Sequence, residues 1–267
     1  MRVVVWDDGG LIGVETALWV RDHGHEVKLL SAPHGLDSYT REEVTEVLRD
    51  CSVVIDLLCR PSLAIGTLTE DQGFVIDEEA LVGSWLRSTR KLLQAATAAG
   101  VTYHVALSVA GVDRAASMGV FRALKARETM IQRSATPHFI LRSTQMFESA
   151  EEIATAGTED WIVWVPPVDV RPVALTDVAM LLAHTAVSRP RTGVHEIAGP
   201  EKVGLDTFVR AALAANAEYR RVFTDVHSPF FGTCLGPSDL LPDANAFIAQ
   251  TSYREWFASR PSPGINS

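Results

Sequence analysis

The chain has 267 residues, of which 47% are hydrophobic, and a formal net charge of −9 at pH 7. This length and apolar content predict one α/β domain with a large core, with or without a small appended lobe. The acidic balance argues against nucleic acid as a partner, because phosphate contacts need clustered Lys and Arg. The chain has no long apolar run, so we expect no membrane span, and the absence of a signal peptide predicts a cytoplasmic protein.

The three cysteines, Cys51, Cys59 and Cys234, are odd in number and widely separated. We expect them to be reduced core residues, as is usual in the cytosol. The sequence shows no zinc-binding spacing, and we predict no metal site.

Residues 2–13 predict a buried strand, a glycine turn and the first turn of a helix. The valines at 3–5 suit a central parallel strand. Gly9 and Gly10 permit a tight turn, and Gly13 lets the helix pack closely on the strand. Dinucleotide-binding folds open in this way and hold a pyrophosphate at the helix N-terminus. The candidate cofactor-binding residues of this stretch are Gly9, Gly10, Leu11 and Ile12.

Two carboxylates set this turn apart. Asp7 takes the first position of a Gly-x-x-Gly-x-x-Gly spacing that continues with Gly10 and Gly13, and Asp8 follows it. Negative charges at this place oppose a diphosphate, and the Asp7 side chain obstructs close approach of the backbone. We therefore expect no dinucleotide, or only weak NAD(P) binding, unless the two aspartates turn outward and cap the helix.

Strands and helices alternate through residue 142. Strands are predicted at residues 3–5, 26–30, 52–58, 103–107 and 138–142. Helices are predicted at residues 11–22, 40–50, 78–99 and 119–133. The alternation predicts a doubly wound parallel sheet of the NAD(P)-binding Rossmann type over about residues 1–142. Residues 61–76 show no clear period, so we interpret them as an insertion or a lid.

The pattern loosens from about residue 143 to 267, which predicts a small C-terminal substrate lobe interleaved with the core of a single domain, 1–267. Its predicted elements are strands at 161–165 and 194–198, helices at 175–188 and 205–215, and an amphipathic segment at 247–257.

The end of the second predicted strand selects the nucleotide in this fold, through an acidic residue for NAD or a basic one for NADP. Here Ser31 is followed by Ala-Pro-His, with no carboxylate before Asp37 and no Arg. This sequence suits neither dinucleotide well and slightly favours NADP. Ser31, and Leu57 at the end of the third strand, complete the candidate cofactor-binding residues.

A series of short motifs follows in order along nearly the whole chain outside residues 63–76. They include Gly10-Leu11-Ile12-Gly13, Gly24-His25-Glu26-Val27, Val53-Val54-Ile55-Asp56-Leu57, His104-Val105-Ala106-Leu107-Ser108, Gly111-Val112-Asp113-Arg114 and Leu141-Arg142-Ser143-Thr144-Gln145. This succession resembles the NmrA-like, atypical short-chain dehydrogenases/reductases. The resemblance implies a Rossmann-type fold and an NAD(P)-related function.

The resemblance also implies a Ser-Tyr-Lys group, in which the tyrosine transfers the proton. Ser108 lies where the serine is expected. The helix that would carry Tyr-x-x-x-Lys has Val120 and Leu124 in these positions, or Phe121 and Lys125 if the alignment shifts by one. The tyrosine is absent in either case. Together with Asp7, this loss predicts that hydride transfer is not the reaction.

Our leading hypothesis is an enzyme that uses non-redox acid/base chemistry on a small, largely apolar metabolite. The reaction would be a cyclisation, dehydration, epoxide opening or rearrangement. Asp7 and Asp8 are the candidate acid and base, because an apolar pocket adjusts the pKa of a carboxyl group. Ser108, the third candidate catalytic residue, would hold a substrate oxygen. The candidate substrate-binding residues are Gln145, Met146, Phe147, Phe230 and Phe231.

Two alternatives remain open at the level of sequence. One is an NAD(P)H-dependent oxidoreductase with an atypical active site, and the other is a non-catalytic NAD(P)-sensing regulatory protein. The sequence also allows a homodimer. His104 lies within a predicted strand and is expected in the core, and Arg142 is expected to anchor the end of the fifth strand.

Overall fold

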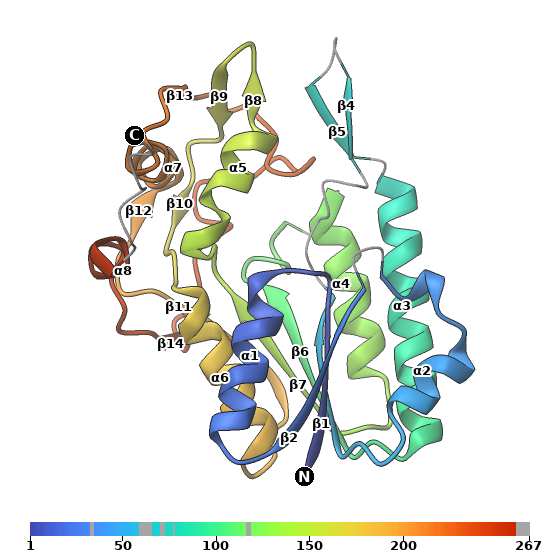
Figure 1. The fold of residues 1–267 in the computed structure, drawn as a ribbon. Coiled ribbons are helices and arrows are strands. Elements are labelled where there is room, and N and C mark those ends of the chain that lie inside the picture. Colours follow the sequence, from blue (N-terminus) through green and yellow to red (C-terminus); the bar gives the residue numbers. More distant parts are fainter. Residues whose placement is uncertain (33–34, 59–65, 70–72, 77, 116–118, 260–267) are drawn as a thin grey trace, which may run out of the picture.

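The computed structural model describes residues 1–32, 35–58, 66–69, 73–76, 78–115 and 119–259. Its centre is a seven-stranded sheet with the order β14-β11-β7-β6-β3-β1-β2 (Figure 1). The strands are β1 (Arg2–Asp7), β2 (Glu26–Ser31), β3 (Val53–Leu57), β6 (Tyr103–Val109), β7 (His138–Ser143), β11 (Gly193–Ala198) and β14 (Phe247–Ile248). All neighbouring pairs are parallel, which confirms the predicted doubly wound α/β sheet.

Helices cover both faces of this sheet (Figure 1). On one side lie α1 (Leu11–Asp22) and α6 (Leu175–Val187), and on the other lie α2 (Arg41–Val47), α3 (Glu78–Ala99) and α4 (Gly119–Gln132). Because successive side chains of a strand point to opposite faces, Val3 and Val5 of β1 join the core on one face while Val4 and Trp6 join it on the other. Burial on both faces explains the continuous apolar run of this strand.

The start of α2 follows from its sequence. Glu43 donates its backbone N–H to Thr40 Oγ1 at 3.1 Å, and Thr40 donates its own N–H to Glu43 Oε2 at 2.7 Å. This reciprocal pair is a capping box, which satisfies two N–H groups that the helix itself leaves open.

The sheet ends at β2. In the usual dinucleotide-binding order, 3-2-1-4-5-6, one further strand lies outside this position. Here the described residues between β2 and β3 form the 3-10 helix η1 (Gly35–Ser38) and α2 instead. The order therefore becomes 2-1-3-4-5-6-7, and the first half of the fold is shorter than in the usual dinucleotide-binding arrangement.

The second half of the chain builds elements beyond the carboxyl ends of the central strands (Figure 1). They are the 3-10 helix η3 (Phe147–Ser149), α5 (Ala150–Ala156), β8 (Thr158–Glu159), β9 (Ile162–Val165), β10 (Asp169–Val170), β12 (Val203–Gly204), α7 (Leu205–Ala215), β13 (Arg221–Thr224) and α8 (Tyr253–Ser259). The predicted amphipathic segment at 247–257 is thus divided between β14 and α8.

The segment predicted as an insertion without a period contains an antiparallel hairpin, β4 (Gly66–Thr69) and β5 (Gly73–Ile76). Residues 61–65 and 70–72 of that prediction lie outside the described residues. None of the described helices has the length and hydropathy that a membrane span requires.

Of the three cysteines, Cys51 is buried as predicted. Cys234 is exposed, so its assignment to the core was wrong: it lies in the irregular C-terminal segment outside the sheet. Cys59 lies outside the described residues.

Candidate functional site

A cavity of about 230 Å³ lies at the carboxyl ends of three central strands. Leu57 at the end of β3, Ser108 near the end of β6 and Ser143 at the end of β7 contribute to its lining. Residues of α4, η3, α5 and the segment at 230–231 complete it. Such a position, outside the carboxyl ends of parallel strands, is where α/β sheets bind their ligands.

Two polar side chains in the lining are buried without a hydrogen-bond partner among the described residues. The hydroxyl oxygen of Ser108 belongs to a residue with no exposed surface, and the amide oxygen of Gln145 belongs to one that is 6% exposed. A buried polar group without a partner is unfavourable. Both groups line the cavity, where a bound molecule would supply the missing hydrogen bonds. Ser108 and Gln145, both predicted as site residues, thus line the same cavity.

The helix that follows β6 presents an apolar wall to the same cavity. Val120, Phe121 and Leu124 of α4 line it. Lys125 does not: its ammonium group pairs with the carboxylate of Asp113, and its side chain is 37% exposed. Of the two possible alignments, the one that places Val120 and Leu124 in the Tyr and Lys positions puts both residues in the cavity lining. Neither side chain transfers a proton.

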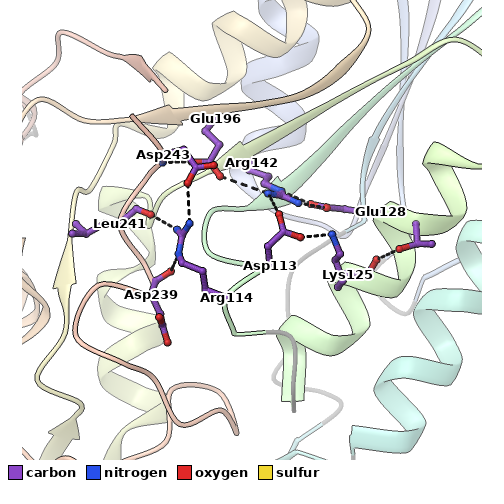
Figure 2. A network of polar contacts seen from close by, with 10 residues as sticks. Asp113, Arg114, Lys125, Glu128, Arg142, Glu196, Asp239, Leu241 and Asp243 are labelled. Carbon is purple, nitrogen blue, oxygen red and sulfur yellow. Dashed lines mark hydrogen bonds and ion pairs between the residues drawn. The ribbon is translucent and has the colours of Figure 1, made fainter. Parts of the chain in front are cut away.

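Charged residues form a network beside this wall (Figure 2). Arg142 of β7 donates to both carboxylate oxygens of Glu128 on α4, at 2.9 and 2.6 Å. Burial works to lower the pKa of Arg142, but the hydrogen bonds that it donates to Glu128 and Asp113 raise it above its usual value. Arg142 thus anchors the end of β7, as predicted.

The same network holds the loop after β6 against the C-terminal segment. Arg114 donates to the backbone oxygen of Asp239 at 3.1 Å and to the carboxylate of Asp243 at 2.9 Å (Figure 2). Gly111 adopts a φ of +87°, and a Cβ there would lie 2.1 Å from the Asp239 oxygen. Glycine is required for this close approach. The network joins elements of the fold, and its residues are not among those described in the cavity lining.

Two carboxylates that sequence reasoning missed line the cavity. Glu148 lies in η3 and Glu152 in α5. Glu148 accepts hydrogen bonds on both oxygens, from the indole nitrogen of Trp256 at 3.0 Å and from the backbone N–H of Leu175 at 3.2 Å. Glu148 directly follows the predicted substrate-binding stretch at 145–147, and this position alone was the available sign. Whether the Glu152 side chain faces the cavity depends on the packing of α5, which the sequence does not show.

Four of the five predicted substrate-binding residues line the cavity: Gln145, Met146, Phe230 and Phe231. Phe147 is not among the described residues that line it. Its ring is 2% exposed and packs against Tyr253 and Trp256 of α8, with ring centroids 5.1 and 5.3 Å apart. The C-terminal helix therefore draws this ring into the core.

Phe231 has a φ of +46°, a conformation that costs a bulky residue about 1–2 kcal/mol. Mutual backbone hydrogen bonds between Phe230 and Thr233, at 2.8 and 3.0 Å, close the turn that imposes it. The chain thus keeps a strained turn that places two aromatic rings at the cavity.

The two aspartates at the end of β1, Asp7 and Asp8, are not among the described residues that line the cavity. Asp7 is 2% exposed, and its carboxylate oxygen accepts the N–H of Gly9 at 3.0 Å. A Cβ on Gly13 would lie 2.5 Å from the Asp7 carboxyl carbon, so Gly13 leaves the space that this side chain fills. The structure does not place the predicted acid and base at the cavity.

This loop fits a dinucleotide poorly. Asp7 brings a negative charge to the turn and takes one backbone N–H that would otherwise be available to a phosphate. Gly10 is the N-cap of α1, and Gly9 and Ser31 are exposed. The other candidate cofactor-binding residues, Leu11, Ile12 and Leu57, line the cavity. They contribute apolar surface to the site already described.

A second polar cluster lies deeper, between β3, β6 and α4. Asp56 pairs with Arg127 at 2.8 Å and with the Nε2 atom of His104 at 3.3 Å, and all three side chains are about 1% exposed. Burial works to raise the pKa of Asp56, but Arg127 and then His104 lower it to about 2. His104 is a core histidine, as predicted.

No protein-family model matches this sequence, and no curated protein matches it. Solved structures do resemble it. MoeE5 in complex with UDP-glucose and NAD has a TM-score of 0.65 at 17% identity, over 97% of this chain and 96% of that chain. WbmG of Bordetella bronchiseptica in complex with NAD has a TM-score of 0.66 at 13% identity, over 97% and 92%.

The NADPH-dependent quinone oxidoreductase QOR2 of Escherichia coli, complexed with NADPH, has a TM-score of 0.59 at 15% identity, over 84% of this chain and 77% of that chain. These levels of identity support the fold alone. The first two structures are both complexes with NAD. The chain has their Rossmann-type fold, which confirms the fold that its sequence motifs imply.

Proposed function

We propose that this chain is an enzyme of the short-chain dehydrogenase/reductase fold that acts on a small, largely apolar metabolite without hydride transfer. One observation carries the proposal. Ser108 and Gln145 present unpartnered polar atoms to a cavity whose expected proton-transfer positions hold Val120 and Leu124. The cavity keeps groups that bind a substrate and lacks the pair that reduction in this fold relies on.

The volume limits the size of the substrate. A cavity of about 150 Å³ holds benzene, which has six non-hydrogen atoms. At the same ratio the cavity of about 230 Å³ holds about nine non-hydrogen atoms. Most of the lining is apolar, so burial of a hydrocarbon body supplies much of the affinity.

The two unpartnered atoms orient the polar end of the substrate. The amide oxygen of Gln145 accepts a hydrogen bond, while the Ser108 hydroxyl donates or accepts one. A substrate hydroxyl that donates to Gln145 and accepts from Ser108 satisfies both. This assignment keeps the predicted role of Ser108 and Gln145 in holding a substrate oxygen.

Glu148 and Glu152 take the acid/base role in this proposal, in place of Asp7 and Asp8. The hydrogen bonds from Trp256 and Leu175 fix the orientation of the Glu148 carboxylate, as a general base requires. In a dehydration, Glu148 removes a proton from the carbon next to the C–O bond. Glu152 gives a proton to the departing hydroxyl, and water leaves. Cyclisation, epoxide opening and rearrangement need the same pair of proton transfers.

NAD(P) is absent from this mechanism or binds weakly, because Asp7 occupies the phosphate loop. The competing function is NAD(P)H-dependent reduction, as the name of QOR2 indicates for that protein. Reduction here would require a proton donor other than the two α4 residues Val120 and Leu124.

The experiment is a turnover screen of the purified protein with small alcohols, epoxides and ketones of about eight to ten non-hydrogen atoms. Mass spectrometry follows loss of water or isomerisation, with and without added NADH and NADPH. We expect turnover that is independent of the nicotinamides and is lost in Glu148→Gln and Ser108→Ala. Glu151→Gln, an exposed neighbour outside the lining, is the control. Turnover that requires NADPH and consumes it in equal amounts would overturn the proposal.

A further inference from the structure

We infer that the ligand of this cavity is a small protonated amine with an apolar or aromatic body. The inference rests on the proposed function, because it names the substrate class of the same cavity. It follows from the acidic groups and the unpartnered polar groups of the described lining, taken together with the aromatic rings.

The first observation is that the described lining is acidic. Glu148 and Glu152 are its acidic members, and no Lys, Arg or His is among the described residues that line it. A cavity with low-dielectric walls concentrates the field of its charges. Such a site favours a cation and disfavours phosphates and carboxylates.

The second observation is independent of these charges. The amide oxygen of Gln145 is an acceptor without a donor among the described residues, and its residue is 6% exposed. The hydroxyl oxygen of Ser108 is fully buried and likewise has no partner there. An ammonium group carries three donors and no acceptor. Its donors match the unpartnered acceptors of Gln145 and Ser108, whereas a substrate carbonyl leaves the Gln145 oxygen unsatisfied.

The third observation concerns the apolar part of the lining. Phe121, Phe230 and Phe231 contribute rings to the cavity, and the centroids of Phe230 and Phe231 lie 4.9 Å apart at 85°. The face of an aromatic ring attracts a cation, and its edge packs well against another ring. The strained backbone of Phe231 holds this ring in place. The rings thus suit both the charge and the body of an arylalkylamine.

The test uses three probes of nearly equal size: phenethylamine, phenethyl alcohol and phenylacetate, with about nine or ten non-hydrogen atoms each. Calorimetry at pH 7 measures the binding of each to the intact protein. We expect the amine to bind about tenfold or more tightly than the alcohol, since charge-assisted hydrogen bonds are about twice as strong as neutral ones. We expect no measurable binding of phenylacetate.

Variants locate the effect. Glu148→Gln and Glu152→Gln should each weaken the amine about tenfold and leave the alcohol unchanged. Glu151→Gln removes the same charge from the adjacent, exposed position and should change neither. The two cavity variants are measured separately, because Glu148 also holds Trp256 and its loss can disturb α8.

Three outcomes would overturn the inference. Equal affinity for amine and alcohol would show that the cavity does not select charge, while the proposed function would stand on its own turnover screen. Amine binding that is unchanged in both cavity variants would place the cation elsewhere. Failure of all three probes to bind would remove the inference and the size estimate of the proposed substrate together.

Discussion

Two groups of polar side chains lie inside this protein, and both include a residue of β6. In the first group, Asp56, His104 and Arg127 are buried, and the Asp56 carboxylate lies 2.8 Å from the Arg127 guanidinium and 3.3 Å from His104 Nε2. In the second, Ser108 and Gln145 are equally buried, but their oxygens have no hydrogen-bond partner in the part of the chain that the structure describes. The Asp56 carboxylate of the first group already has its cation inside the protein, whereas the two oxygens of the second group have no hydrogen-bond partner among the described residues.

The difference separates stability from function. Removing one member of the paired group leaves a buried charge uncompensated, which is costly. Removing an unpartnered hydroxyl leaves nothing uncompensated, so the folded state loses little. The two groups should therefore respond in opposite ways to substitution.

The largest expected effect is on the paired group. Arg127→Met replaces the guanidinium with an apolar side chain of similar length, and it leaves the Asp56 carboxylate buried without its cation. We expect the free energy of unfolding, measured by chemical denaturation, to fall by about 3–5 kcal/mol. The control is Arg41→Ala, which breaks an ion pair whose side chains are 60% and 73% exposed. That change should cost less than about 1 kcal/mol. A similar small loss for Arg127→Met would contradict the assignment.

The next effect is a dependence on pH. The pKa of Asp56 is about 2 in the folded protein, below the ordinary value of 3.8. A carboxyl group with a lowered folded pKa stabilises the protein above its unfolded pKa and loses that contribution as the pH falls. Asp56 should thus contribute about 2 kcal/mol at neutral pH, lost between about pH 5 and pH 2.

Nuclear magnetic resonance of the Asp56 carboxyl carbon measures this titration directly. In Arg127→Met the midpoint should move upward, because burial then acts against ionisation without the opposing cation. A wild-type midpoint at or above 3.8 would show that the pair is not formed as described.

The sequence was sufficient for the fold and for part of the site. Buried strands such as β1 and β6 show continuous apolar runs, and their alternation with helices determines a parallel sheet. Ser108 was proposed from the resemblance, and Gln145 closes one of the motifs that carry it; the neighbouring parallel strands β6 and β7 bring both residues to one cavity. These are consequences of local pattern and of a regular topology.

The directions of side chains beyond the strand ends were not predictable in the same way. Phe147 turns toward Tyr253 and Trp256, which lie more than a hundred residues further along the chain. Asp7 turns toward α1 because Gly13 leaves room for its carboxylate. Glycine spacing shows that a close contact exists but does not show which partner fills it.

A change at Asp7 extends the comparison to the loop after β1. Asp7→Gly removes the negative charge and releases the N–H of Gly9. We expect NADPH affinity, measured by calorimetry, to rise about tenfold, which corresponds to about 1.4 kcal/mol. Asp7→Asn keeps the size of the side chain and removes only the charge, so it separates the two causes. Unchanged affinity in both variants would show that Asp7 is not the obstacle.

The smallest effect on stability is the most direct test of the comparison, because α3 and β6 each carry a buried serine, Ser88 and Ser108. The hydroxyl oxygen of Ser88 accepts the N–H of Leu36 at 2.8 Å, whereas that of Ser108 has no such partner among the described residues. Ser88→Ala leaves a buried N–H without an acceptor and should lower the free energy of unfolding by about 1–3 kcal/mol. Ser108→Ala should leave it unchanged or raise it by up to about 1 kcal/mol.

Ligand binding should reverse this order. Ser108→Ala is expected to weaken phenethyl alcohol binding by about three- to tenfold, the value of one hydrogen bond, and Ser88→Ala should not change it. If Ser108→Ala instead destabilises the protein as much as Ser88→Ala, its hydroxyl already has a partner in the folded chain. A polar group that the protein itself satisfies gives no reason to expect a ligand. The cavity would then be a packing defect and not a binding site.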